Sequence, residues 1–206
     1  FLSQEKFFEI FSLQKEKEIL TILPGSRLQE IEKLFPIVIE AAELIANKYN
    51  LQIVVGCASN IDENKFYELS NKDNFKIIKH HTYELIKYSK FGIIKSGTST
   101  LEAALLGLPM VIVYKTNILS YLIGKSLINL DKIGMANIIL EQKVVPELIQ
   151  NDVQPAKIFN EVDRILSNEK IYNSIKNQFK NIKEILGTFS GSEKAANIII
   201  NFLNAY

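Results

Sequence analysis

Residues 91–102 read FGIIKSGTSTLE, an apolar strand followed by a polar turn and the start of a helix. The helix is predicted over Leu101 to Leu106 and ends before Gly107-Leu108-Pro109. Gly97 and its hydroxyl neighbours leave the first helical N–H groups free, and such a helix start attracts phosphate. Glu102 lies about one turn further on, where a carboxylate could accept hydrogen bonds from a ribose diol. The stretch predicts a nucleotide diphosphate site or, more simply, a well-capped helix on an α/β sheet.

A second junction of the same kind lies near the amino terminus. The strand predicted over Ile19–Leu23 is followed by Pro24-Gly25-Ser26-Arg27 and a long helix. Ser26 and Gln29 have the spacing of a capping box, with Ser26 as the N-cap. Arg27 then lies in the first helical turn, where its charge opposes the helix dipole. A nearby anion explains a cation in that place, and a guanidinium suits phosphate geometry; a solvated surface charge is the simpler alternative.

Strands and helices alternate along residues 1–154. Strands are predicted over 19–23, 51–55, 75–78, 91–94 and 110–114, and helices over 27–49, 62–69, 83–88, 101–106 and 118–128. Pro36 is expected to interrupt or kink the first long helix. This alternation is typical of an α/β protein with a doubly wound, Rossmann-like parallel sheet of about five or six strands.

The pattern changes at Pro155. Three helices with no strand between them are predicted over 155–166, 169–185 and 192–203. We therefore divide the chain into a Rossmann-like domain, residues 1–154, and a helical carboxyl-terminal extension, residues 155–206. The cluster from Ile198 to Leu203 is too apolar for a free surface helix, so it must pack on the sheet, on another domain or on a partner chain.

Four polar loops follow the carboxyl ends of predicted strands. They are Gly25–Arg27, His80–Thr82, Gly97–Ser99 and Tyr114–Thr116. Because ligands of open α/β sheets bind beyond the carboxyl ends of the strands, these loops predict one site at one edge of the sheet. Neither a G-x-G-x-x-G nor a G-x-x-x-x-G-K-[ST] sequence occurs, so the site is neither the dinucleotide fingerprint nor a Walker loop.

The composition argues against several other classes of protein. The formal net charge is +1 and no basic run occurs, so no nucleic-acid partner is expected. The single Cys57 excludes an internal disulfide, and the adjacent His80 and His81 would point to opposite faces of a strand. With no Asp-x-Asp pair either, no metal site is predicted. No apolar run is long enough to span a bilayer, and the start at Phe1 suggests a fragment.

Three blocks of the sequence resemble the lipid-A-disaccharide synthase family. The first is LPGSR at residues 23–27 with Glu30-Ile31, and the second is SGTSTLEAA at residues 96–104 with Pro109-Met110-Val111. The third is ANII at residues 136–139 with VVPELIQ at residues 144–150. The blocks occur in the family's order, and the resemblance covers nearly the whole chain. It implies a glycosyltransferase of the GT-B type with two Rossmann-like domains, of which this chain matches the carboxyl-terminal, donor-binding half.

The resemblance also implies a reaction. The family transfers 2,3-diacylglucosamine from UDP-2,3-diacylglucosamine to 2,3-diacylglucosamine 1-phosphate, giving lipid A disaccharide 1-phosphate and UDP. No metal or other cofactor is implied. The enzyme would be cytoplasmic and peripheral to the inner membrane of a Gram-negative bacterium. The acceptor site and an acidic catalytic base belong to the amino-terminal half, which has no counterpart here. We therefore expect no catalytic residue in this chain, weak UDP binding and no turnover.

Carried over residue by residue, the resemblance implies a donor site. Its expected members are Gly25, Ser26 and Arg27 at the diphosphate, Gly97, Thr98, Ser99 and Thr100 at the second helix start, Glu102 at the ribose, and Asn137. Ala136 departs from the family's Pro-Asn pair, and Tyr114-Lys115 replaces a Tyr-Arg pair, which keeps the charge without the bidentate fork. The loop at residues 80–82 is expected to contact uracil.

Two alternatives stay open. Another UDP-hexosamine enzyme of the same fold, such as a 2-epimerase or a different transferase, would share residues 96–102 but lack the third block. A non-catalytic nucleotide-binding module is the second alternative. The apolar terminal helix also fits exchange between the protomers of a homodimer, and the helix predicted at 118–128, with Tyr121, could contact acyl chains or the membrane surface.

Overall fold

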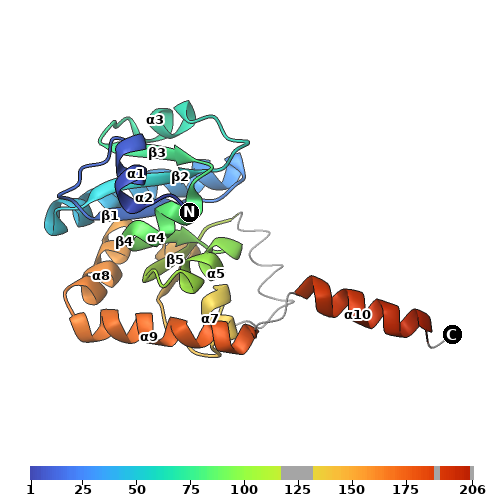
Figure 1. The fold of residues 1–206 in the computed structure, drawn as a ribbon. Coiled ribbons are helices and arrows are strands. Elements are labelled where there is room, and N and C mark those ends of the chain that lie inside the picture. Colours follow the sequence, from blue (N-terminus) through green and yellow to red (C-terminus); the bar gives the residue numbers. More distant parts are fainter. Residues whose placement is uncertain (117–131, 188–190, 205–206) are drawn as a thin grey trace.

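A six-stranded parallel sheet organises the computed structural model, which describes residues 1–116, 132–187 and 191–204 (Figure 1). The strand order is β3-β2-β1-β4-β5-β6. The strands are β1 (Ile19–Leu23), β2 (Gln52–Cys57), β3 (Phe75–Lys79), β4 (Ser89–Lys95), β5 (Met110–Tyr114) and β6 (Glu147–Ile149). The predicted doubly wound α/β fold is confirmed. No strand was predicted at β6, because three residues are too few to show a strand pattern.

Helices cover both faces of the sheet. The helices that pack on the body of the molecule are α1 (Gln4–Ile10), α2 (Leu28–Tyr49), α3 (Asn64–Ser70), α4 (Thr82–Tyr88), α5 (Thr98–Leu105), α7 (Met135–Ile139), α8 (Pro155–Leu166) and α9 (Glu169–Leu186), and a last helix, α10 (Gly191–Asn204), follows them. On one side α2 packs against α3 and α8, and on the other α5 packs against α4, α7 and α9. The helix predicted at 118–128 lies outside the described residues.

β1 is the centre of the sheet. All of its residues are buried, as expected for a parallel strand that is covered on both faces. Its polar member, Thr21, donates its hydroxyl to Ser89 Oγ at 2.8 Å, while the Ser89 hydroxyl donates to the Leu85 carbonyl at 2.6 Å. The chain runs outward from β1 to β2 and β3, and then crosses back to β4 on the other side of β1. The topological switch point of the sheet therefore lies between β1 and β4.

The long helix α2 continues through Pro36 without a break. The prediction of an interruption there was wrong. Proline removes one backbone donor from the helix interior, but the helix is held by apolar packing on both sides of it. Leu34 and Phe35 are buried before the proline, and Val38 and Ile39 are buried after it.

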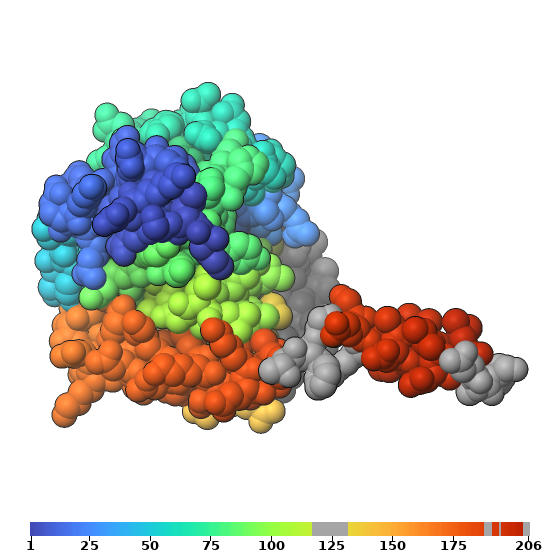
Figure 2. Space-filling view, viewed as in Figure 1, coloured from blue at the N-terminus to red at the C-terminus, as the bar shows by residue number. Residues whose placement is uncertain are grey.

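The carboxyl-terminal helices differ in how they pack. α8 and α9 contribute to the same core as the sheet, with Val162 and Phe179 among their buried residues. In contrast, α10 projects from the body of the molecule (Figures 1 and 2), and its Ile198 and Leu203 side chains are more than half exposed. Which of the three predicted surfaces this helix packs on stays a prediction. The division at residue 154 stays a prediction.

Among the described residues, no helix has the length and apolarity needed to cross a bilayer.

A buried polar cluster fixes α7 against β6. The Asn137 side chain is fully buried and donates to the Val145 carbonyl and to Glu147 Oε1, each at 2.8 Å. Its oxygen accepts from the Val144 and Val145 amides at 2.9 and 3.1 Å. Glu147 also accepts from the Gly134 amide at 2.9 Å, at the start of α7. The third sequence block therefore forms α7, β6 and the buried turn that joins them.

Replacing Asn137 is expected to destabilise the fold. Asn137→Ala leaves the Val144 and Val145 amides and the Val145 carbonyl without their side-chain partner in a buried turn, which should cost about 2–4 kcal/mol of unfolding free energy. Urea unfolding followed by circular dichroism measures it. Asn181→Ala, on the exposed face of α9, is the matched control and should change stability by less than about 0.5 kcal/mol. Equal effects of the two substitutions would contradict the structural role of Asn137.

Alkaline pH is expected to weaken the docking of α9. The Tyr172 hydroxyl donates to the Lys90 carbonyl at 2.9 Å, and burial, helped by the charge of Glu18, raises the pKa of Tyr172 to about 12. An unfolded tyrosine ionises near pH 10, so the folded state holds this proton longer, and its contribution is lost as pH rises from about 10 to 12. Between these pH values, stability should fall less steeply in Tyr172→Phe than in the wild type, as measured by urea midpoints. Parallel slopes would show that Tyr172 ionises normally.

Candidate functional site

A pocket lies at the switch point of the sheet. It has a volume of about 260 Å³ and is lined by residues that follow the carboxyl ends of β1, β2 and β4. From the β1–α2 turn come Gly25, Ser26 and Arg27, and from the β4–α5 turn come Gly97, Thr98 and Ser99. Because β1 and β4 send their chains to opposite faces of the sheet, the crevice between their ends stays open. The two phosphate-type turns predicted from the sequence therefore meet in one place.

The β1–α2 turn depends on Gly25. Its φ of +118° lies where side chains are strained, and a Cβ there would come within 2.9 Å of Glu30 Oε2. The chain then enters α2 one residue later than we predicted: Arg27 is the N-cap, without a side-chain cap, and its carbonyl accepts from the amides of Glu30 and Ile31. The capping box of Ser26 and Gln29 was therefore wrong. Ser26 precedes the N-cap, and its carbonyl accepts from Asn60 Nδ2 at 3.2 Å.

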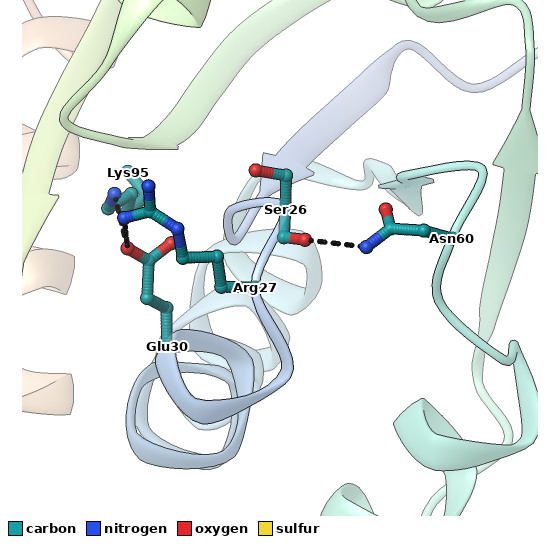
Figure 3. Close-up of polar contacts among 5 residues, drawn as sticks. All are labelled: Ser26, Arg27, Glu30, Asn60 and Lys95. Atoms are coloured by element: carbon teal, nitrogen blue, oxygen red, sulfur yellow. Dashed lines mark hydrogen bonds and ion pairs between the residues drawn. The ribbon is translucent and has the colours of Figure 1, made fainter.

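A carboxylate between two cations lies on one wall of the pocket (Figure 3). Glu30 Oε1 is 3.0 Å from Lys95 Nζ and 3.4 Å from Arg27 Nη1. The Arg27 side chain is 81% exposed, whereas Lys95 and Glu30 are 16% and 20% exposed. Arg27 is therefore a cation at the rim of the pocket, and Lys95 is a cation deeper inside. The sequence analysis missed Lys95 as a site residue, although its place directly before Ser96 at the end of β4 could have indicated it.

The β4–α5 turn presents a helix start to the pocket. α5 begins at Thr98 and not at Leu101, so Thr98, Ser99 and Thr100 form its first turn. Gly97 is extended, and a Cβ on it would meet nothing within 4 Å. Neither backbone strain nor packing within the described residues requires glycine there, and the open space in front of Gly97 suits the close approach of a ligand to the backbone. The first amides of a helix lack intrahelical partners and favour anions.

Three of the nine predicted donor-site residues, Thr100, Glu102 and Asn137, are not among the residues that line the pocket. Thr100 is buried; its hydroxyl donates to the Gly97 carbonyl at 2.7 Å and accepts from the Met135 amide at 3.2 Å. Asn137 is engaged in the turn between α7 and β6. Glu102 is half-buried one turn into α5. Thr100 thus ties the β4–α5 turn to α7, and Asn137 ties α7 to β6. The roles predicted for all three residues at the donor stay predictions.

The other loops predicted at this edge contribute unequally. Thr82 lines the pocket, whereas His81 lies at the N-cap of α4 with Nδ1 at 3.6 Å from Glu84 Oε2. Tyr114 contributes indirectly, because its ring lies 5.6 Å below Lys95 Nζ. Sequence reasoning also missed the end of β2, from which Gly56 and Cys57 line the floor.

The described side chains offer no set of metal ligands. In residues 1–116, 132–187 and 191–204, no three His, Cys, Asp or Glu side chains gather around one point. Burial raises the pKa of the Cys57 thiol, so this group stays protonated near neutral pH and is a poor nucleophile. The chemistry that the pocket can supply is anion binding, by two cations and two helix starts.

Comparison with known proteins identifies the fold type. The glycosyltransferase WaaG, involved in lipopolysaccharide biosynthesis, superposes with a TM-score of 0.63 at 16% identity, over 96% of this chain and 50% of that chain. E. coli ADP-heptose LPS heptosyltransferase II gives 0.59 at 14% identity, over 82% and 54% of the two chains. Likeness at such identities shows the fold alone, which is that of one half of a GT-B glycosyltransferase.

Sequence comparison identifies the family. A family model described as lipid-A-disaccharide synthetase matches residues 3–200. The lipid-A-disaccharide synthase of Persephonella marina is 34% identical over 204 residues, covering 96% of this chain and 54% of that protein. That of Geobacter sulfurreducens is 34% identical over 205 residues, covering 98% and 53%. The chain thus spans about half the length of the curated relatives it matches. It belongs to the lipid-A-disaccharide synthetase family.

Proposed function

We propose that this chain is the donor-binding half of a lipid-A-disaccharide synthase. The donor would be UDP-2,3-diacylglucosamine and the acceptor 2,3-diacylglucosamine 1-phosphate. The observation that carries the proposal is the meeting of the β1–α2 and β4–α5 turns in one pocket that holds Arg27, Lys95 and the open backbone at Gly97. A nucleoside diphosphate matches this arrangement, because cations and backbone N–H donors at a helix start bind phosphate groups.

The role of the pocket in the reaction would be to stabilise the leaving group. The 6-hydroxyl oxygen of the acceptor forms a bond to the anomeric carbon of the donor, while the bond between that carbon and the phosphate oxygen breaks. UDP leaves with the electron pair, and the hydroxyl proton passes to a base outside this chain. Negative charge develops on the diphosphate, where Arg27 and the amides at the start of α5 are already in place.

The remaining parts of the enzyme would come from elsewhere. Of the acidic residues described, only Glu30 lines the pocket, and it is paired with Lys95 and Arg27. We therefore assign the base and the acceptor site to an amino-terminal half. The exposed apolar side chains of α10 support a further contact, with that half or with a second copy of the chain. The lipid substrates would bring the enzyme to the cytoplasmic surface of the inner membrane.

Binding of UDP is the first expected outcome. Calorimetric titration should give weak binding that favours UDP over ADP, and Arg27→Ala should weaken it about 10–100-fold, because a hydrogen bond between charged groups is lost. Arg164→Ala is the matched control: Arg164 also pairs with a glutamate three residues away, at 2.8 Å, but lies on α8. Equal losses in both variants, or binding without preference for UDP, would contradict the proposed site. If the wild type alone binds nothing, the titration is repeated with the amino-terminal half added.

The isolated chain is expected to make no disaccharide. It would hold the leaving group but provide no base for the acceptor hydroxyl, so mixing it with donor and acceptor should give no product by thin-layer chromatography. Adding the amino-terminal half in trans should restore synthesis, and the full-length Geobacter sulfurreducens relative serves as the positive control. Product formed by the chain alone would show that the base lies within these residues.

A further inference from the structure

Lys95 is the less exposed of the two cations in the pocket. It is the last residue of β4, and its side chain passes over Gly25. A Cβ built on Gly25 would lie 3.5 Å from Lys95 Cδ. The ammonium lies 3.0 Å from Glu30 Oε1 and 5.6 Å from the centre of the Tyr114 ring, and the side chain is 16% exposed. Because an ammonium group is costly to remove from water, its place here needs a reason beyond packing.

The pair with Glu30 does not fully balance this charge. Glu30 also faces Arg27 Nη1 at 3.4 Å, so one carboxylate is shared by two cations. No other charged side chain lines the described pocket. One positive charge is therefore in excess, next to the start of α5. A lysine ammonium has three N–H donors, and the bond to Glu30 uses one of them, which leaves two for another acceptor.

We propose that Lys95 binds the diphosphate together with Arg27, and that Glu30 is a positioning residue that keeps the two cations directed at it. The inference rests on the proposed function, because it takes the ligand to be a nucleoside diphosphate. The two cations have different tasks. Lys95 is a fixed point charge at the end of β4, whereas Arg27 reaches the ligand from the exposed rim with a planar group. As UDP leaves, both stabilise the charge that the terminal phosphate gains.

The test compares ligands that differ in their phosphates. UDP, UMP and uridine are titrated against the wild type and Lys95→Met, with the amino-terminal half present if the proposed function requires it. Lys95→Met should weaken UDP binding about 10–50-fold, as expected for one charged hydrogen bond, and leave uridine binding unchanged. Lys95→Arg should recover part of the loss because it keeps the charge. Lys90→Met is the matched control: it lies near the opposite end of the same strand, pairs with Glu18 at 3.2 Å, and should leave UDP binding unchanged.

Glu30→Gln tests the positioning role separately. It keeps an acceptor for Lys95 but removes the charge that holds both cations. UDP binding should weaken, and Lys95→Met in this background should cost less than threefold, since coupled residues are not additive. Tighter UDP binding in Glu30→Gln would show that the carboxylate only opposes the ligand, and would overturn this part.

The outcomes separate the inference from the proposed function. If Lys95→Met binds UDP as the wild type does while Arg27→Ala loses it, the inference on Lys95 is wrong and the proposed function stands. If UDP does not bind even with the amino-terminal half present, both fall. Urea unfolding shows whether Lys95→Met is folded, and if it is not, Lys95→Gln, which also removes the charge, is compared with Lys90→Met by the ratio of UDP to UMP affinity. An unchanged ratio in Lys95→Gln would then overturn the inference.

Discussion

β1 pairs with β2 on one side and with β4 on the other, and the rest of the molecule depends on this arrangement. The chain leaves β1 toward one face of the sheet and leaves β4 toward the other, so neither connection covers the gap between the two strand ends. Both connections begin with a turn and a helix start. The fold thereby brings two helix starts, whose backbone donors favour anions, to one open crevice.

Hydrogen bonds outside the crevice hold the β4–α5 turn in position. Ser96 donates to the Ile133 carbonyl at 2.8 Å, and the Met135 amide donates to Thr100. Both bonds tie the β4–α5 turn to the segment before α7. That segment is in turn held by Glu147, which accepts from the Ile133 and Gly134 amides at 2.9 Å. A Cβ on Gly134 would lie 2.2 Å from Ile112 Cδ1, so Ile112 would have to move to admit a side chain there. The third sequence block thus acts on the site indirectly, through the hydrogen bonds of Glu147.

The charged side chains of the site differ in their exposure to solvent. Arg27 is largely exposed, so its ion pair with Glu30 adds little to the stability of the fold. Lys95 and Glu30 lie deeper, where solvent screens the attraction between their charges less. The sequence places these groups far apart along the chain, and the meeting of the β1–α2 and β4–α5 turns brings them together. A carboxylate that contacts both cations can set their relative position before any ligand arrives.

The alternation of apolar strands with helices was enough to predict the fold. A parallel sheet that is covered on both faces needs strands that are apolar on both sides, and ILTIL at β1 is an example. Glycine and hydroxyl residues at strand ends likewise predicted both turns of the pocket. The amino-acid sequence did not reveal that α2 starts at Leu28 or continues through Pro36, since tertiary packing outweighs local capping and propensity there. Nor did it separate Ser99, which faces the pocket, from Thr100, which is buried one residue later. Only the tertiary structure decided which residues of these motifs line the pocket, and that Lys95 lines it with them, because direction and burial depend on neighbours that are distant in sequence.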